Sequence, residues 1–165
     1  MSFFNSKLEE FNKYIKGKKV AIIGLGVSNL PLIDYLYEKE AKVTIFDNKE
    51  KDKISNEILN KIDNYNFNYF FGENSFENLK NFNLIFRSPS VLPTNQYLLE
   101  ESNRGAIVTT EVELLMKMCP CKIVGVTGSD GKTTTTSLIN AILKEGGYKT
   151  HLGGNIGTPL FTKLP

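Results

Sequence analysis

The stretch 19–31, Lys-Val-Ala-Ile-Ile-Gly-Leu-Gly-Val-Ser-Asn-Leu-Pro, decides the fold. Its apolar run predicts a buried strand, and Gly24 and Gly26 predict a tight turn directly after it. Ser28 or Asn29 is suited to cap a helix, and the proline that follows fits the first helical turn, where its missing N–H is not needed. The stretch therefore predicts a strand, a glycine turn and a helix in direct succession.

The same alternation continues along the chain. Further strands are predicted at 42–46, 68–72, 83–86 and 106–109, and helices near 57–62, 96–103 and 111–118. Strands separated by helical stretches imply right-handed crossovers and a parallel sheet with helices on both faces. We therefore expect residues 1–118 to form an α/β domain, a Rossmann-like doubly wound parallel sheet.

A second unit is predicted to begin at residue 119, next to a proline. The sequence predicts a strand over 122–126, a glycine-rich turn, a helix over 134–145 ended by two glycines, and a strand-and-loop segment from 149 onward. Roughly 45 residues are too few for an independent α/β core. We therefore expect residues 119–165 to be the truncated beginning of a second nucleotide-binding domain.

Composition narrows the classes of function. The 165 residues are 41% hydrophobic and 23% charged, which suffices for a packed core, and the formal net charge is only +2. No lysine and arginine cluster indicates a nucleic-acid or anionic-membrane partner. No apolar run approaches the roughly 18 residues of a membrane-spanning helix, and the first residues lack the pattern of a signal peptide. A cytoplasmic protein is expected.

The first candidate site is the turn Gly24-x-Gly26-x-x-Asn29 together with Asp47. Glycines permit a tight turn and the close approach of a phosphate, and a helix N-terminus supplies free N–H donors. Asp47 ends the next predicted strand, where it is placed to meet a ribose hydroxyl. Asn29 stands where a third glycine is usual, and the residues do not say which nucleotide binds. A structural glycine turn is the alternative.

The second candidate site is the stretch 124–134, Val-Gly-Val-Thr-Gly-Ser-Asp-Gly-Lys-Thr-Thr. Successive N–H groups of such a loop wrap a polyphosphate, Lys132 neutralises its β- and γ-phosphates, and the Thr133 hydroxyl ligates Mg²⁺. The pattern G-x-x-x-x-G-K-[ST] fails because Val126 occupies the first glycine position, whereas the tighter T-G-x-x-G-K-T is matched. The predicted ATP-binding residues are Gly128, Ser129, Asp130, Gly131, Lys132, Thr133, Thr134 and Thr135.

These two motifs, with Gly-Leu-Gly-Val-Ser at 24–28, Ser-Pro at 88–89 and Gly-Gly-Asn-Ile-Gly-Thr-Pro at 153–159, resemble the Mur ligases of peptidoglycan synthesis. The resemblance covers essentially the whole chain and is greatest to the members that add D-glutamate. It implies an N-terminal domain followed by the start of a central P-loop ATPase domain. It also implies UDP-N-acetylmuramoyl-L-alanine, D-glutamate and ATP as substrates, Mg²⁺ as cofactor, and a monomer.

The resemblance further implies that the first domain holds the UDP of the substrate rather than NAD. The implied substrate-binding residues are Gly26, Val27 and Ser28 at the diphosphate, Asp47 and Asn48 at the uridine, Ser88, Pro89 and Ser90 along the cleft, and Asn155 near the second domain. The family usually has glycine at the position of Ser90, so the serine in this chain departs from the family pattern. Arg87 beside this cleft is either an anion contact or a solvated arginine.

The reaction implied by the resemblance uses no enzyme nucleophile. ATP phosphorylates the substrate carboxylate to an acyl phosphate, which the amine of D-glutamate attacks, and Lys132 and Mg²⁺ act by neutralising charge. The other metal ligands, a carbamylated lysine and the amino-acid-binding domain are expected beyond Pro165. The 165-residue chain by itself is therefore expected to be inactive.

Three alternatives stay open at this point. One is another ligase of the same family, including the folylpolyglutamate type, which shares the phosphate loop. The second is a dinucleotide-sensing regulatory module that uses Gly24, Gly26 and Asp47 but leaves Lys132 unexplained. The third is a small P-loop kinase or GTPase, which needs a complete core after residue 119.

Overall fold

The computed structural model describes residues 5–154 and 160–164. Its centre is a parallel five-stranded sheet in the order β3-β2-β1-β4-β5. The strands are β1 (Lys19–Ile23), β2 (Lys42–Asp47), β3 (Asn68–Phe71), β4 (Leu84–Arg87) and β5 (Ile107–Thr109). The helices are α1 (Ser6–Ile15), α2 (Leu30–Glu38), α3 (Asn56–Asn64), α4 (Gln96–Asn103), α5 (Glu111–Met118) and α6 (Lys132–Glu145), with 3₁₀ turns η1 (Lys51–Lys53), η2 (Ser75–Asn78) and η3 (Phe161–Lys163).

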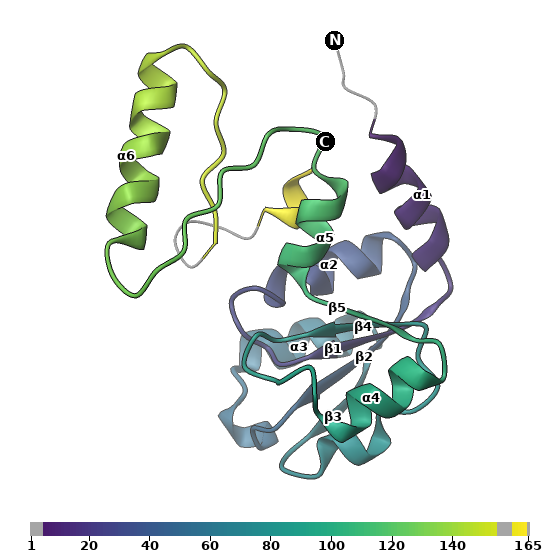
Figure 1. The fold of residues 1–165 in the computed structure, drawn as a ribbon. Coiled ribbons are helices and arrows are strands. Elements are labelled where there is room, and N and C mark those ends of the chain that lie inside the picture. The colour runs from purple at the N-terminus through teal and green to yellow at the C-terminus, as the bar shows by residue number, and fades with distance from the viewer. Residues whose placement is uncertain (1–4, 155–159, 165) are drawn as a thin grey trace.

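Helices cover both faces of the sheet, which confirms the predicted doubly wound α/β fold. Figure 1 shows α1, α2 and α5 above the sheet and α4 below it. Alternate residues of β1 supply the two cores, since Val20 and Ile22 pack in one cluster and Ala21 and Ile23 in the other. All four are fully buried. Burial on both faces explains why β1 is a continuous apolar run rather than an alternating one.

Local sequence signals set the helix boundaries. Helix α5 has the predicted bounds because Thr110 and Glu113 form a capping box, in which the Glu113 amide donates to Thr110 Oγ1 (3.1 Å) and the Thr110 amide to Glu113 Oε2 (2.9 Å). Helix α6 begins at Lys132, two residues before the prediction, and ends at Glu145 as predicted. Gly147 follows it with φ +80°, the left-handed conformation that commonly ends helices.

The strand predicted over 122–126 is wrong, and residues 149–154 contain no strand either. Ile123 and Val124 are 46% and 61% exposed, and no described strand lies beside them to pair with their backbone. An apolar β-branched run forms a strand only where a neighbouring strand satisfies its N–H and C=O groups. The sequence pattern alone does not supply that neighbour.

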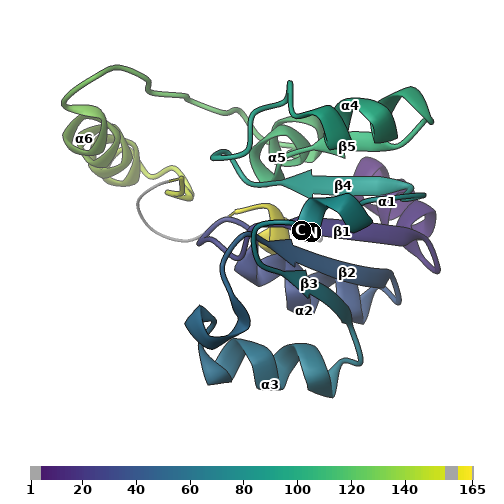
Figure 2. The same ribbon diagram turned by 90° about the horizontal axis from the view of Figure 1, so that it is seen from below.

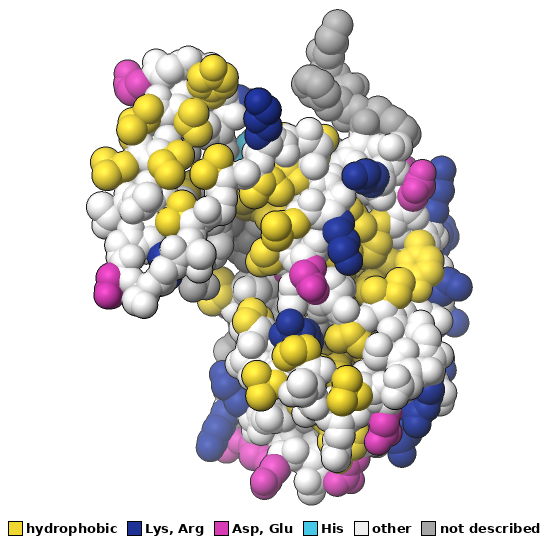
Figure 3. All heavy atoms as spheres, in the orientation of Figure 1, with side chains coloured by type: hydrophobic (Ala, Val, Ile, Leu, Met, Phe, Trp, Pro, Cys, Tyr) yellow, Lys and Arg dark blue, Asp and Glu magenta, His cyan; other side chains and the backbone are white. Residues whose placement is uncertain are grey.

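Helix α6 lies apart from the sheet and its helices in both ribbon views (Figures 1 and 2). None of its described side chains is buried, and Leu138 and Ile142 are 58% and 69% exposed. Figure 3 shows hydrophobic side chains gathered over this helix. After the described chain resumes at Leu160, η3 packs back against α2 and α5. Across the described ranges, no helix has the length and apolar character to cross a bilayer.

Candidate functional site

The strand order reverses between β1 and β4, which makes their carboxyl ends the topological switch point of the sheet. Ile23, the last residue of β1, pairs with Arg87, the last residue of β4. The chain then continues toward α2 from β1 and toward α4 from β4, and these helices pack on opposite faces. Sheets of this kind bind ligands in the crevice that such a divergence creates.

Gly24 is required by the closeness of the two strand ends. Its φ is +84°, and a Cβ added there would lie 2.8 Å from the Cβ of Ser88. The Ser88 amide donates to the Ile23 carbonyl (2.9 Å), which fixes this approach. Gly26 differs, because a Cβ there would meet nothing within 4 Å and its φ is not positive. The space at Gly26 leaves the predicted close approach of a phosphate sterically open.

Asn29 has a structural role that the glycine pattern did not predict. Its side chain is 1% exposed and its Nδ2 donates to the carbonyls of Ile23 (2.9 Å) and Gly24 (3.0 Å). It occupies the N-cap position of α2 but makes no side-chain capping bond. In place of the usual third glycine, this amide therefore stabilises the turn from the helix side.

Asp47 links the turns that follow β1 and β2. Its Oδ2 accepts from the Leu25 amide (2.7 Å) and its Oδ1 from the Lys49 amide (2.9 Å), and the residue is 8% exposed. A carboxylate has further acceptor positions, so these bonds leave the predicted ribose contact chemically open. The neighbouring Asn48 is exposed, and its Oδ1 accepts from Ser75 Oγ (3.5 Å).

The loop after β4 accommodates the departure at Ser90. Ser90 does not have a positive φ, so this position makes no conformational demand for glycine. Its hydroxyl instead pairs with that of Ser88 (2.9 Å). Arg87 Nη1 donates to the Val91 carbonyl (3.1 Å), which holds the guanidinium at the strand end.

A cavity of about 290 Å³ opens at this edge, and we call it the switch-point cavity. Its lining residues are Ser28, Asn29, Arg87, Pro89, Thr110, Glu111 and Val112. Two of the predicted substrate residues, Ser28 and Pro89, line it, whereas Gly26, Val27, Asp47, Asn48, Ser88 and Ser90 do not. Sequence reasoning missed Thr110, Glu111 and Val112, because only the fold brings the start of α5 beside the ends of β1 and β4.

Glu111 is the buried acid of this cavity. The residue is 4% exposed, and its Oε1 accepts from the Phe161 amide at 2.7 Å. Burial raises the pKa of the Glu111 carboxyl, and backbone hydrogen bonds from Phe161 and Leu160 partly oppose that rise. Arg87 supplies a cation to the same cavity.

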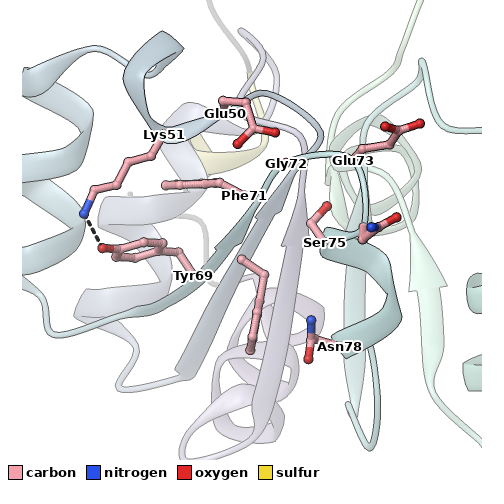
Figure 4. A pocket seen from close by; sticks show the side chains of 10 residues that line it. Glu50, Lys51, Tyr69, Phe71, Gly72, Glu73, Ser75 and Asn78 are labelled. Carbon is pink, nitrogen blue, oxygen red and sulfur yellow. Dashed lines mark hydrogen bonds between the residues drawn. The ribbon is translucent and has the colours of Figure 1, made fainter.

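A larger, more open hollow of about 640 Å³ lies at the outer edge strand (Figure 4). Lys51 and Tyr69 are hydrogen-bonded there, and the Glu50 carboxylate lies over Gly72, where an added Cβ would come within 2.8 Å of it. None of the residues predicted to bind nucleotide lines this hollow. Because it lies beyond β2 and away from the switch point, we assign the candidate site to the smaller cavity.

The predicted phosphate loop is exposed and has an unused donor set. The first intrahelical bond of α6 runs from the Thr135 amide to the Gly131 carbonyl (2.9 Å), so the amides of Lys132, Thr133 and Thr134 precede the helical ladder. Lys132 Nζ donates to the carbonyls of Gly128 and Ser129. This set of amides and one ammonium fits a polyphosphate, provided that Lys132 turns away from its own loop.

The threonines after Lys132 differ in their surroundings. Thr136 Oγ1 donates to the Lys132 carbonyl (2.7 Å), so this hydroxyl is used within the helix. Thr133, predicted to ligate Mg²⁺, is exposed at the second position of α6. No cluster of three acidic, histidine or cysteine side chains that would hold a metal occurs among the residues with described positions. Asn155, the remaining predicted substrate residue, lies outside the described residues.

Comparisons with known proteins identify the family of the chain. The family model for the Mur ligase MurD-like N-terminal domain matches residues 18–110, more than half of the chain. The chain belongs to this family. Two relatives named UDP-N-acetylmuramoylalanine–D-glutamate ligase are 49% identical (Clostridium acetobutylicum, 94% of the chain) and 48% identical (Clostridium tetani, 97% of the chain). The chain spans 34% and 35% of their lengths, about a third.

Solved structures show the same fold. A pseudomurein peptide ligase type C from Methanothermus fervidus matches with a TM-score of 0.50 and 27% identity, over 90% of this chain and 31% of that one. A murein peptide ligase from Psychrobacter arcticus matches with a TM-score of 0.51 and 19% identity, over 79% of this chain and 27% of that one. The Mur ligase assignment thus agrees with both the sequence and the sheet topology.

Proposed function

We propose that this Mur ligase chain belongs to an ATP-dependent enzyme that adds D-glutamate to UDP-N-acetylmuramoyl-L-alanine, with the UDP-linked substrate bound at the switch point. The observation that carries the proposal is the switch-point cavity at the end of the glycine turn, which is lined by Arg87 and Ser28. Both are donors suited to a diphosphate. The names and 48–49% identity of the two clostridial relatives support D-glutamate as the amino acid added.

Each part of the proposed site has a distinct task. Ser28 and Arg87, with the backbone at Gly26 and Val27, bind the diphosphate, and the Asp47 and Asn48 end of β2 faces the uridine. Ser88, Pro89 and Ser90 form the opposite wall. The loop Gly128–Thr135 binds ATP through its amides and Lys132, and Thr133 holds Mg²⁺, which would neutralise charge on the transferred phosphoryl group.

The proposed chemistry depends on positioning and charge. ATP phosphorylates the L-alanine carboxylate of the UDP-linked substrate, and the D-glutamate amine then displaces phosphate from the acyl phosphate. No described side chain is needed as a nucleophile. What the site must provide is close approach of two anionic substrates, and Arg87 and Lys132 offset that repulsion. A nucleotide-linked precursor and ATP place the reaction in the cytoplasm.

Thermal unfolding with added ligand tests the proposal. UDP-N-acetylmuramoyl-L-alanine at 100 times its Kd should stabilise the chain by about 2.7 kcal/mol, and NAD should not. Arg87→Ala should weaken binding about tenfold or more because it removes a charge-assisted contact. Lys80→Ala, an exposed cation remote from the cavity, is the matched control. Stabilisation by NAD and not by the UDP compound would refute the assignment.

A further inference from the structure

Glu111 takes part in both the wall of the switch-point cavity and a contact with the segment around Phe161. Its side chain is part of the wall of the switch-point cavity, and the same carboxylate accepts the Phe161 amide at 2.7 Å. The two residues are 50 positions apart in the sequence. The return segment, residues 160–164, is therefore attached to the first domain at the rim of the proposed substrate site.

The attachment also has an apolar half. The Phe161 side chain is fully buried and meets the rings of Phe11 (5.8 Å between centroids) and Tyr35 (5.3 Å) edge-on. These rings come from α1 and α2, so Phe161 contacts two helices of the first domain while its amide contacts a third. Such edge-to-face pairs contribute beyond their buried area.

The stretch that carries Lys132 is consequently attached to the first domain at two places. It leaves the domain at Cys119, directly after α5, and the chain is attached again at Phe161. The phosphate loop and α6 lie between these two places. Fixing both ends restricts where the loop can move relative to the switch-point cavity.

The negative charge of the Glu111 carboxylate affects both the attachment of the return segment and the binding of an anionic ligand. A bare carboxylate in the wall of the cavity would repel an anionic diphosphate, and the backbone N–H of Phe161 places positive partial charge against it. Releasing the return segment removes that compensation. A ligand that fills the cavity also excludes the water that would otherwise compete for the same carboxylate.

We propose that Glu111 is a positioning residue that attaches the return segment to the rim of the switch-point cavity, so that this attachment and the bound UDP-linked substrate stabilise each other. The inference rests on the proposed function, because it takes this cavity to be the substrate site. Where two such events are coupled, thermodynamic linkage makes the coupling equal in both directions, so each event can be used to measure it.

Amide hydrogen exchange of the 165-residue chain, with and without UDP-N-acetylmuramoyl-L-alanine, tests the proposal. We expect protection in residues 160–164 without ligand, and about tenfold slower exchange when the ligand is bound. Glu111→Ala should remove both effects. Glu111→Gln should restore the protection without ligand, because its amide oxygen still accepts the Phe161 amide, but should reduce the ligand effect, because it carries no charge to compensate. Val112→Ala, which alters the same cavity wall and leaves the Glu111 carboxylate in place, should keep both effects.

A second variant tests the coupling away from the cavity. Phe161 does not line the cavity, yet Phe161→Ala should weaken binding of UDP-N-acetylmuramoyl-L-alanine to the folded chain at least about fivefold. Ile142→Ala, an apolar truncation at an exposed position of α6, should leave binding unchanged.

The outcomes are distinguishable. Unprotected amides at 160–164 in the ligand-free chain would overturn the proposal, and so would bound ligand that leaves their exchange unchanged. Full ligand-dependent protection in Glu111→Ala would also overturn it. A chain that does not bind the UDP compound but loses protection in Glu111→Ala would refute the proposed function and support the attachment.

Discussion

Replacing Gly24 by alanine tests the close approach of β1 and β4 directly. The new Cβ would lie 2.8 Å from the Cβ of Ser88, well inside contact distance, and the residue would keep φ +84°. The left-handed conformation costs an L-residue about 1–2 kcal/mol, and an overpacked methyl group costs about 1–3 kcal/mol. Because Ser88 is held by its bond to the Ile23 carbonyl, we expect only part of the overlap to relax. The total is about 2–4 kcal/mol, or a fall in Tm of roughly 5–15 °C.

Gly26→Ala is the matched control, since it lies two residues away in the same turn, meets no atom within 4 Å and has no positive φ. It should cost at most about 1 kcal/mol. Urea unfolding followed by circular dichroism measures both variants. Equal stability of the two variants would refute the reasoning, because it would mean that the strand ends do not meet as closely as described.

Three further predictions concern single side chains. Asp47→Ala should lower the free energy of unfolding in urea by about 3 kcal/mol, because it removes the acceptor of both the Leu25 and the Lys49 amides. Asp47→Asn should lower it by less, and an equal loss in the two variants would contradict this prediction. Burial raises the pKa of Glu111, so the folded state binds this proton more tightly than the unfolded state, and the carboxyl contributes most stability at low pH. Relative to wild type, Glu111→Gln should therefore gain stability as pH rises from the acidic range to neutrality, and a pH-independent difference would be inconsistent with a raised pKa. Lys132→Ala should change the free energy of unfolding by less than about 0.5 kcal/mol yet abolish the stabilisation of the chain by ATP. Lys144→Ala, the control at an exposed lysine of the same helix, should keep that stabilisation. If ATP still stabilises the Lys132→Ala variant, Lys132 is not part of the ATP site.

The fold was largely predictable because its signals are local. The capping pair at Thr110 and Glu113 sets the start of α5, and the apolar run before Gly24 sets β1. Strands with helices between them leave few topologies once right-handed crossovers are required. The failed strand at 122–126 had a local signal as well, but pairing is a non-local condition that its own residues do not contain.

The site was predictable only in part, for the same reason. The glycines and Asp47 are visible in the sequence because they follow strands, but the bonds from Asp47 to two backbone amides depend on how two turns meet. Glu111 reads in the sequence as an ordinary acid in a first helical turn. Its hydrogen bond with the Phe161 amide joins residues 50 positions apart, and no local pattern predicts a contact over that separation.

The return of Phe161 has a consequence for where this protein should be divided. Excision at Met118, where the alternation of strands and helices ends, would yield a domain that lacks the ring packed between Phe11 and Tyr35. Those two aromatic faces would then be exposed to water, and the Glu111 carboxylate would lose its backbone donor. Residues 160–164 therefore pack as part of the same unit as residues 5–118, although the phosphate loop lies between them in the sequence.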